Sequence, residues 1–251
     1  AEILDVLNKT KAEEITAYVD KVSDEPLMKE TPKAGKIVKT EEGAFGSTVL
    51  TLSNGVRVVV KNTDFKADEI RMSAFSPGGT SIFGTGEALQ VKMLNSVAGL
   101  GGLGNFSNVD LEKVLAGKKA SISASVNGLT ERLNGSCSPK DLETLMQLVY
   151  LTFTAPRMDE AAFESFKQRT KASLANQEAD PSTAFSDTLN HEMYGNHPMA
   201  GRIKSEMIDQ IDYNHIMEMY KDRFKEAGDF TFLFVGNINL EEAKPLIETY
   251  L

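Results

Sequence analysis

The 251-residue sequence contains no tryptophan, a single cysteine (Cys137) and three histidines. One cysteine excludes an internal disulfide and a cysteine-rich metal site. No apolar run approaches the roughly 20 residues that a membrane-spanning helix needs, so no membrane span is expected. The 36 acidic residues outnumber the 27 lysines and arginines, which gives a net charge of −9. No nucleic-acid partner is expected, because phosphate binding needs a concentrated basic surface.

The N-terminus lacks an initiator methionine. Its first stretch, AEILDVLNKT, has neither the basic region nor the apolar core of a signal peptide. Such a beginning is typical of the interior of a helix. We therefore expect this chain to be a segment of a longer protein.

The chain divides into an arm and a domain. Residues 1–24 carry apolar side chains among charges at helical spacing, which predicts a helix. Residues 25–46 lose this periodicity and contain prolines and glycines, which is typical of a linker or an extended arm. The sequence predicts a helix and linker over residues 1–46 and one compact domain over residues 47–251.

Two Asn-Gly pairs predict β-hairpins. Residues 47–62 contain two short strands around Asn54-Gly55, a pair that accepts the positive φ angles of a type I′ turn. A third strand is expected over residues 69–76, before a Pro-Gly-Gly turn. A hairpin around Asn127-Gly128 follows later.

The second hairpin has an alternating first arm, KASISASV, in which apolar residues and serines take turns. One of its faces should pack, while the other meets water or another layer. Cys137 ends the second arm. We expect it to be a small buried apolar residue and not a nucleophile.

Helices fill most of the remaining sequence. Ser138 and Pro139 are expected to be the N-cap and first residue of one of them. The apolar residues that mark this helix and the next three are Leu142, Leu145, Met146, Val149 and Phe153; Phe163, Phe166 and Leu174; Phe185, Leu189 and Met193; and Tyr213, Ile216, Met217, Tyr220 and Phe224. The run FTFLFVG is typical of a buried strand, and Asn239 begins a final helix. The order β-β-β-α-α-β-β-α-α-α-α-β-α predicts an α+β domain, with an antiparallel or mixed sheet and helices packed on one side.

The stretch HEMYGNHP has the residue types of a zinc-peptidase site. A zinc helix needs its two histidines four residues apart, as in His-Glu-x-x-His or the inverse His-x-x-Glu-His. The residues four before and four after His191 are Asp187 and Gly195, so the spacing fails. We expect a helix that Gly195 ends, with His197 in a polar loop. The third histidine, His215, faces away from the apolar stripe of its helix.

Two glycine-rich stretches are predicted to be turns. GLGGLG, residues 99–104, formally contains the G-x-G-x-x-G of dinucleotide sites, which must leave a strand and open a helix. Here it follows a helical pattern, so a loop between helices is expected. SPGGTS lacks the Gly-Lys-Ser/Thr of a phosphate loop. No serine stands in G-x-S-x-G, and no catalytic constellation is predicted from these residues.

Several phrases nevertheless resemble one family in their order along the chain. They are LSNGVRVVV (52–60), DEIRMSAFSPGGTS (68–81), SPKDLETLMQLVYLTFTAPRMDEAAFE (138–164), YGNHPMAG (194–201) and the closing run of residues 208–251. Together they resemble the pitrilysin and insulin-degrading-enzyme family of inverted zinc metallopeptidases, which includes the mitochondrial processing peptidases. The resemblance covers residues 47–251.

The resemblance implies a peptidase built from repeated α+β units that form two halves of a hinged chamber. In that family the His-x-x-Glu-His motif lies on the helix after the glycine turn. Here its three positions fall at Gln90, Met93 and Leu94, and the third ligand, a glutamate, falls near Ala172. Zinc needs three protein ligands to activate a water, and these residues supply none. The resemblance therefore implies no metal ligand and no catalytic residue in this segment.

This departure resembles the second-half units of the family, which keep the fold and lose the metal. We expect a non-catalytic wall of a substrate chamber, whose partners are the zinc-bearing half of its own polypeptide and peptide substrates. Zinc is expected in that half. The peptide-binding residues are unknown from the sequence. The alternatives are a non-enzymatic scaffold of the same fold and an unrelated α+β binding module. The bacterial members imply a periplasmic or cell-envelope location.

Overall fold

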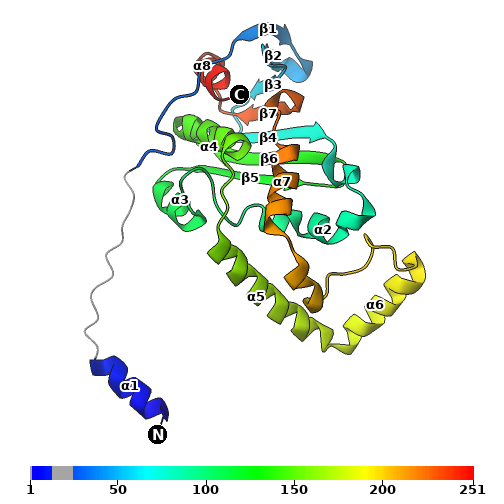
Figure 1. Cartoon of the computed structure of the whole chain (residues 1–251). Helices are drawn as coiled ribbons and strands as arrows, with labels where there is room; N and C mark the ends of the chain where they lie inside the picture. The colour runs from blue at the N-terminus through cyan, green and yellow to red at the C-terminus, as the bar shows by residue number, and fades with distance from the viewer. Residues whose placement is uncertain (1, 13–24) are drawn as a thin grey trace.

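A seven-stranded mixed sheet organises the chain (Figure 1). The computed structural model describes residues 2–12 and 25–251. The strands are β1 (Ile37–Glu42), β2 (Thr48–Leu52), β3 (Arg57–Asn62), β4 (Ile70–Pro77), β5 (Ala120–Val126), β6 (Thr130–Cys137) and β7 (Thr231–Gly236). Their order is β1-β2-β3-β7-β4-β6-β5, in which β3 and β7 are parallel and the other neighbours antiparallel.

The α-helices are α1 (Glu2–Ala12), α2 (Ala88–Val97), α3 (Asn108–Val114), α4 (Leu142–Thr154), α5 (Glu160–Glu178), α6 (Pro181–Tyr194), α7 (Tyr213–Arg223) and α8 (Leu240–Tyr250). Short 3-10 helices are η1 (Ala44–Gly46), η2 (Gly79–Ile82), η3 (Thr85–Glu87), η4 (Pro139–Asp141), η5 (Ser205–Gln210) and η6 (Ala227–Asp229). From β2 onward the strands and α-helices follow the predicted order. α1 confirms the first part of the predicted N-terminal helix, and residues 13–24 lie outside the described residues. No helix in the described ranges is both long and apolar enough to cross a membrane.

Strand β1 is an addition that the sequence did not predict. It pairs with β2 at the edge of the sheet, and most of its residues are exposed. A charged edge strand shows no apolar alternation, which is why its sequence, IVKTEE, resembles a linker. The backbone N–H of Ile37 donates to Glu248 Oε1 at 2.8 Å, which ties the strand to α8. The division at residue 47 stays a prediction about domain organisation.

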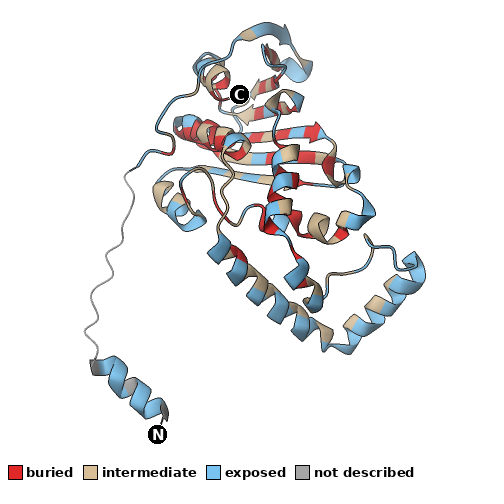
Figure 2. Cartoon of the chain, viewed as in Figure 1, coloured by how far each residue is buried: buried red, intermediate tan, exposed pale blue. Residues whose placement is uncertain are grey.

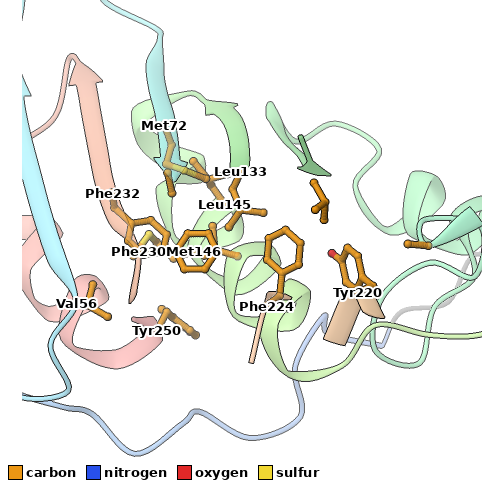
Figure 3. Packing of buried hydrophobic residues seen from close by; sticks show 14 of the residues in the cluster. Val56, Met72, Leu133, Leu145, Met146, Tyr220, Phe224, Phe230, Phe232 and Tyr250 are labelled. Carbon is orange, nitrogen blue, oxygen red and sulfur yellow. The ribbon is translucent and has the colours of Figure 1, made fainter. Parts of the chain in front are cut away.

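The core lies between the sheet and the helices on one of its faces, as predicted. Figure 3 shows Phe232 and Met72 of the sheet beside Leu145 and Met146 of α4, with Phe224 nearby. All five side chains are at most 2% exposed. Burying side chains of this size stabilises a fold by about 1.5–3 kcal/mol each.

The other face of the sheet is open. Phe75 is 50% exposed and Leu233 is 39% exposed, although both belong to central strands. The expectation that FTFLFVG forms a fully buried strand is therefore wrong for one of its faces. Phe232 and Phe234 are buried, whereas Leu233 points away from the helices.

The first hairpin forms at Asn54-Gly55, but its turn is not of type I′. Gly55 has a φ of 95°, whereas Asn54 does not have a positive φ. The Leu52 N–H donates to Val56 O at 2.9 Å, and the Gly55 N–H donates to Leu52 O at 3.0 Å. These bonds close a three-residue loop with a glycine bulge, an arrangement that Asn-Gly also favours. The tip is held by Asn54 Nδ2, which donates to Leu251 O at 2.7 Å.

The glycine turn after β4 is docked against the tip of the second hairpin. The N–H groups of Gly78 and Thr80 donate to the carbonyls of Leu129 and Asn127 at 2.9 and 2.7 Å. Gly79 has a φ of 64°, and a Cβ there would lie 2.3 Å from Asn127 O. The predicted turn is confirmed, and its contacts with the second hairpin fix the start of the segment leading to α2.

The start of α4 differs from the prediction. Ser138 does not cap the helix with its side chain, and η4 precedes α4. Instead, Ser138 Oγ donates to Asp141 Oδ2 at 2.6 Å, and the same oxygen accepts the Lys119 N–H at 3.0 Å. The carboxylate joins the helix start to the beginning of β5.

Candidate functional site

Helix α2 is the first α-helix after the glycine turn, where the resemblance implies the position of the zinc motif. Met93 and Leu94 are 4% and 0% exposed, and both belong to the core. Gln90 Nε2 donates to Gln210 O at 3.1 Å, and Gln90 Oε1 accepts the N–H of Asp212 at 3.2 Å. The three side chains therefore pack the helix and fasten the start of α7. They do not fit a zinc ion, which takes histidine, cysteine or carboxylate ligands.

The remaining ligand position is equally unsuited. Ala172 is exposed on α5 and carries no donor atom in its side chain. Within residues 2–12 and 25–251, no three His, Cys, Asp or Glu side chains gather as a metal ion would require.

The HEMYGNHP segment forms a capped helix end, which confirms that prediction. Gly195 adopts the left-handed conformation, with φ 58° and ψ 43°, and its N–H donates to His191 O at 2.8 Å. His191 Nδ1 lies 2.6 Å from Asn196 Oδ1. His197 Nδ1 accepts the N–H of Met199 at 3.3 Å. Each imidazole thus stabilises its own local turn.

A cavity of about 640 Å³ lies between α2, α6 and the loop of residues 196–204. Both His191 and His197 line it. Lys92 of α2 enters from the other side, where its Nζ donates to the carbonyls of Pro198 (2.6 Å) and Gly201. Burial lowers the pKa of Lys92. The lysine therefore holds the loop against α2 through backbone carbonyls.

An ion-pair network around Arg202, which the sequence analysis missed, joins α5 and α6. Arg202 Nε donates to both carboxylate oxygens of Asp187, at 2.8 and 2.9 Å, and Nη1 lies 3.4 Å from Glu178 Oε1. The hydrogen bond with Asp187 raises the pKa of Arg202. Ser205 donates to Glu178 through N–H and Oγ, both at 2.7 Å, and the N–H bond is the main cause of the lowered pKa of Glu178. The sequence spacing of Arg202, Asp187 and Glu178 does not indicate that they interact, because the fold alone brings their side chains together.

His215 belongs to a different polar contact. Its Nε2 lies 2.8 Å from Glu87 Oε2, and its Nδ1 lies 3.7 Å from Glu218 Oε2. Asp212 caps the same helix through the His215 N–H at 3.0 Å. The hydrogen bond with Glu87 is the main cause of a raised pKa of His215. The contact between His215 and Glu87 joins α7 to the N-terminus of α2.

The raised pKa gives a pH prediction. The contribution of His215 to stability is fully present below its ordinary pKa of 6.5 and is lost as the pH rises through the higher folded value. The melting temperature should therefore fall more between about pH 6 and pH 9 in the wild type than in His215→Gln. Thermal unfolding of both proteins across this range measures the difference. Equal slopes would show that the pair does not couple to stability.

The GLGGLG stretch forms a loop between α2 and α3, as predicted. A Cβ on Gly101 would lie 2.0 Å from Arg157 O, and one on Gly102 would lie 2.2 Å from Phe106 O. Gly102 also has a φ of 88°. Glycine is therefore required at these two positions by close contacts with neighbouring backbone atoms. A dinucleotide-binding loop must follow a strand, whereas this loop follows helix α2.

Cys137 is 4% exposed in the core, which confirms the expected small buried residue. Burial raises the pKa of its thiol to about 12. At pH 8 the thiolate fraction is therefore negligible. We expect no alkylation of the folded chain by iodoacetamide at this pH and stoichiometric alkylation in urea. Intact-mass measurement separates the two outcomes, and rapid labelling of folded protein would contradict the buried position.

Comparison with known proteins finds curated relatives of this chain, among them two PqqL-type proteins. A zinc protease PQQL-like protein of Arabidopsis thaliana is 29% identical over 254 residues, covering 99% of this chain and 24% of the relative. The probable zinc protease PqqL of Escherichia coli (strain K12) is 22% identical over 251 residues, covering 100% and 27%. The chain thus spans about a quarter of the length of the curated relatives it matches. No family-wide sequence profile matches it.

Solved structures share the fold. The periplasmic protease PqqL from Escherichia coli superposes with a TM-score of 0.78 at 22% identity, over 99% of this chain and 27% of that one. The first half of the same protease gives 0.61 at 13% identity, over 85% and 47%. A peptidase M16 inactive domain from Pseudomonas fluorescens gives 0.63 at 15% identity, over 82% and 50%.

The relatives and the shared fold agree with the phrases that resemble the pitrilysin family. Helix α2 carries Gln90, Met93 and Leu94 at the positions where the resemblance to that family would place the zinc motif. The chain is therefore similar along nearly its whole length to PqqL-type zinc proteases, shares the fold of their solved structures, and carries the phrases that resemble the pitrilysin family of zinc peptidases.

Proposed function

We propose that this chain is a non-catalytic unit of a longer zinc metallopeptidase and forms one wall of the chamber in which the zinc-bearing half cleaves peptides. The observation that carries the proposal is α2, whose zinc-motif positions are filled by a backbone-bonded amide and two core side chains. The zinc and the general base would then belong to the other half of the polypeptide. No feature of the described residues favours a scaffold role over this one.

A wall without metal contributes to catalysis by closing the chamber. Closure excludes water, completes the site and gates product release. The periplasmic location named for PqqL of Escherichia coli supports the same location for the parent of this chain. Its substrates would be peptides, as the family resemblance implies.

Deletion and addition test this role. We expect the full-length polypeptide without residues 47–251 to keep its zinc and to lose about a hundredfold or more in kcat/KM on a fluorogenic peptide, because the chamber no longer closes. Adding the 251-residue chain in trans should restore part of the activity. Loss of zinc on deletion would place a ligand in this unit, and unchanged activity would contradict the role of a wall.

A further inference from the structure

Helix α6 turns its apolar side to the solvent. Phe185, Leu189 and Met193, which we call the α6 stripe, are 70%, 48% and 62% exposed. At 100° per residue they lie within about 80° of one another on the helix surface. The sequence predicted this helix from the same three residues, and the structure shows that they do not face the core (Figure 2).

The opposite side of α6 is polar and faces the protein. Thr183, Asp187 and Asn190 are its half-buried positions, and Asp187 holds Arg202 with two hydrogen bonds. A surface helix normally has the reverse arrangement, with its apolar stripe against the core. The polar contacts therefore fix α6 with its apolar stripe outward.

Both ends of α6 are fixed as well. Asp180 Oδ1 accepts the Ser182 N–H at 2.9 Å, Pro181 is the first helical residue, and Gly195 ends the helix in the left-handed conformation. A capped helix with a fixed inner face presents the stripe as a preformed surface. Contiguous exposed apolar side chains of this kind mark interaction sites.

We propose that the α6 stripe packs against another part of the same longer polypeptide, so that it is a contact through which this unit is held in the chamber. This inference rests on the proposed function. The relatives provide the partner: PqqL is nearly four times as long as this chain, and its first half contains the same fold in 47% of its length. A tethered partner reaches a high effective concentration, so that a small apolar stripe suffices.

Two other occupants fit less well. Helices that bind membrane surfaces carry Lys or Arg beside their apolar face, and α6, with the sequence PSTAFSDTLNHEMY, has neither. A second copy of the chain would bring together two molecules with a net charge of −9 each. Another part of the same polypeptide can overcome charge repulsion of this kind, because the covalent connection keeps its local concentration high.

Site-specific labelling tests the contact. Leu189→Cys places a thiol in the stripe, and Glu112→Cys places one on the exposed side of α3 as a reference. Each is introduced into the 251-residue chain and into the full-length polypeptide, and maleimide labelling is followed by mass spectrometry of the peptide. We expect residue 189 to react at least about tenfold more slowly in the full-length protein, and residue 112 to react equally in both. Equal rates at residue 189 would overturn the proposal.

A charge in the stripe provides a second measurement. Leu189→Lys should leave the melting temperature of the 251-residue chain unchanged and lower that of the full-length polypeptide, because only the latter buries the ammonium group. Unchanged melting of both proteins would overturn the proposal. A dimer of the 251-residue chain that Leu189→Lys dissociates in sedimentation would also overturn it, by assigning the stripe to self-association. Zinc content and peptide hydrolysis test the proposed function separately.

Discussion

Replacing Arg223 by methionine is expected to lower the free energy of unfolding by about 3 kcal/mol, because it leaves the buried carboxylate of Glu131 without its counter-charge. Glu131 is 1% exposed, and its Oε1 lies 3.3 Å from Arg223 Nη1. The same oxygen accepts the N–H of Gly79 at 2.8 Å, so that the pair also holds the glycine turn before α2. Urea unfolding measures the loss.

Two controls separate this effect from the loss of a surface charge. Arg71→Met removes an arginine whose side chain is 72% exposed and should cost less than about 0.5 kcal/mol. Glu131→Gln keeps an acceptor for Gly79 and removes the charge. Combining it with Arg223→Met should therefore recover at least about 1 kcal/mol relative to the sum of the single changes. If Arg223→Met costs no more than Arg71→Met, the buried pair does not stabilise the turn.

Replacing Gly101 by alanine is expected to cost about 3 kcal/mol, because the new Cβ would lie 2.0 Å from the backbone oxygen of Arg157. The segment before α5 crosses the loop after α2 at this point, where the Arg157 N–H donates to Gly102 O at 3.2 Å and Arg157 Nη1 donates to Gly101 O at 2.7 Å. Relief would require the backbone to shift. Urea or thermal unfolding measures the cost.

The same motif contains the matched control. Gly99 has no atom within 4 Å of its would-be Cβ and no positive φ, so Gly99→Ala should change the stability by less than about 0.5 kcal/mol. A difference between the two substitutions supports a packing role for GLGGLG. Equal, small effects would contradict the close contact at Gly101.

Much of the fold could be predicted from short sequence patterns, because turns and amphipathic helices are determined mainly by residues close together in the sequence. Asn-Gly pairs fix hairpins, and the spacing of Leu145, Met146 and Val149 gives the buried face of α4. Strand β1 escaped prediction because an exposed edge strand needs no apolar alternation. The turn at Asn54-Gly55 could be predicted as a turn, but its type depends on the register with Val56.

Tertiary contacts limited what could be predicted of the candidate site. The end of α6 at Gly195 could be predicted, because a glycine after a helical pattern is a common helix stop. The outward direction of the α6 stripe could not be predicted, since the polar pair of Asp187 with Arg202 decides which face of α6 turns inward. Likewise, the role of Gln90 depends on a backbone carbonyl 120 residues away.

Zinc binding by the chain itself tests the central claim most directly. The folded 251-residue chain, incubated with excess zinc and desalted, is expected to retain no stoichiometric zinc by metal analysis and to hydrolyse no fluorogenic peptide, because α2 carries glutamine, methionine and leucine at the motif positions. Retention of one zinc per chain, lost on His191→Ala, would contradict the account.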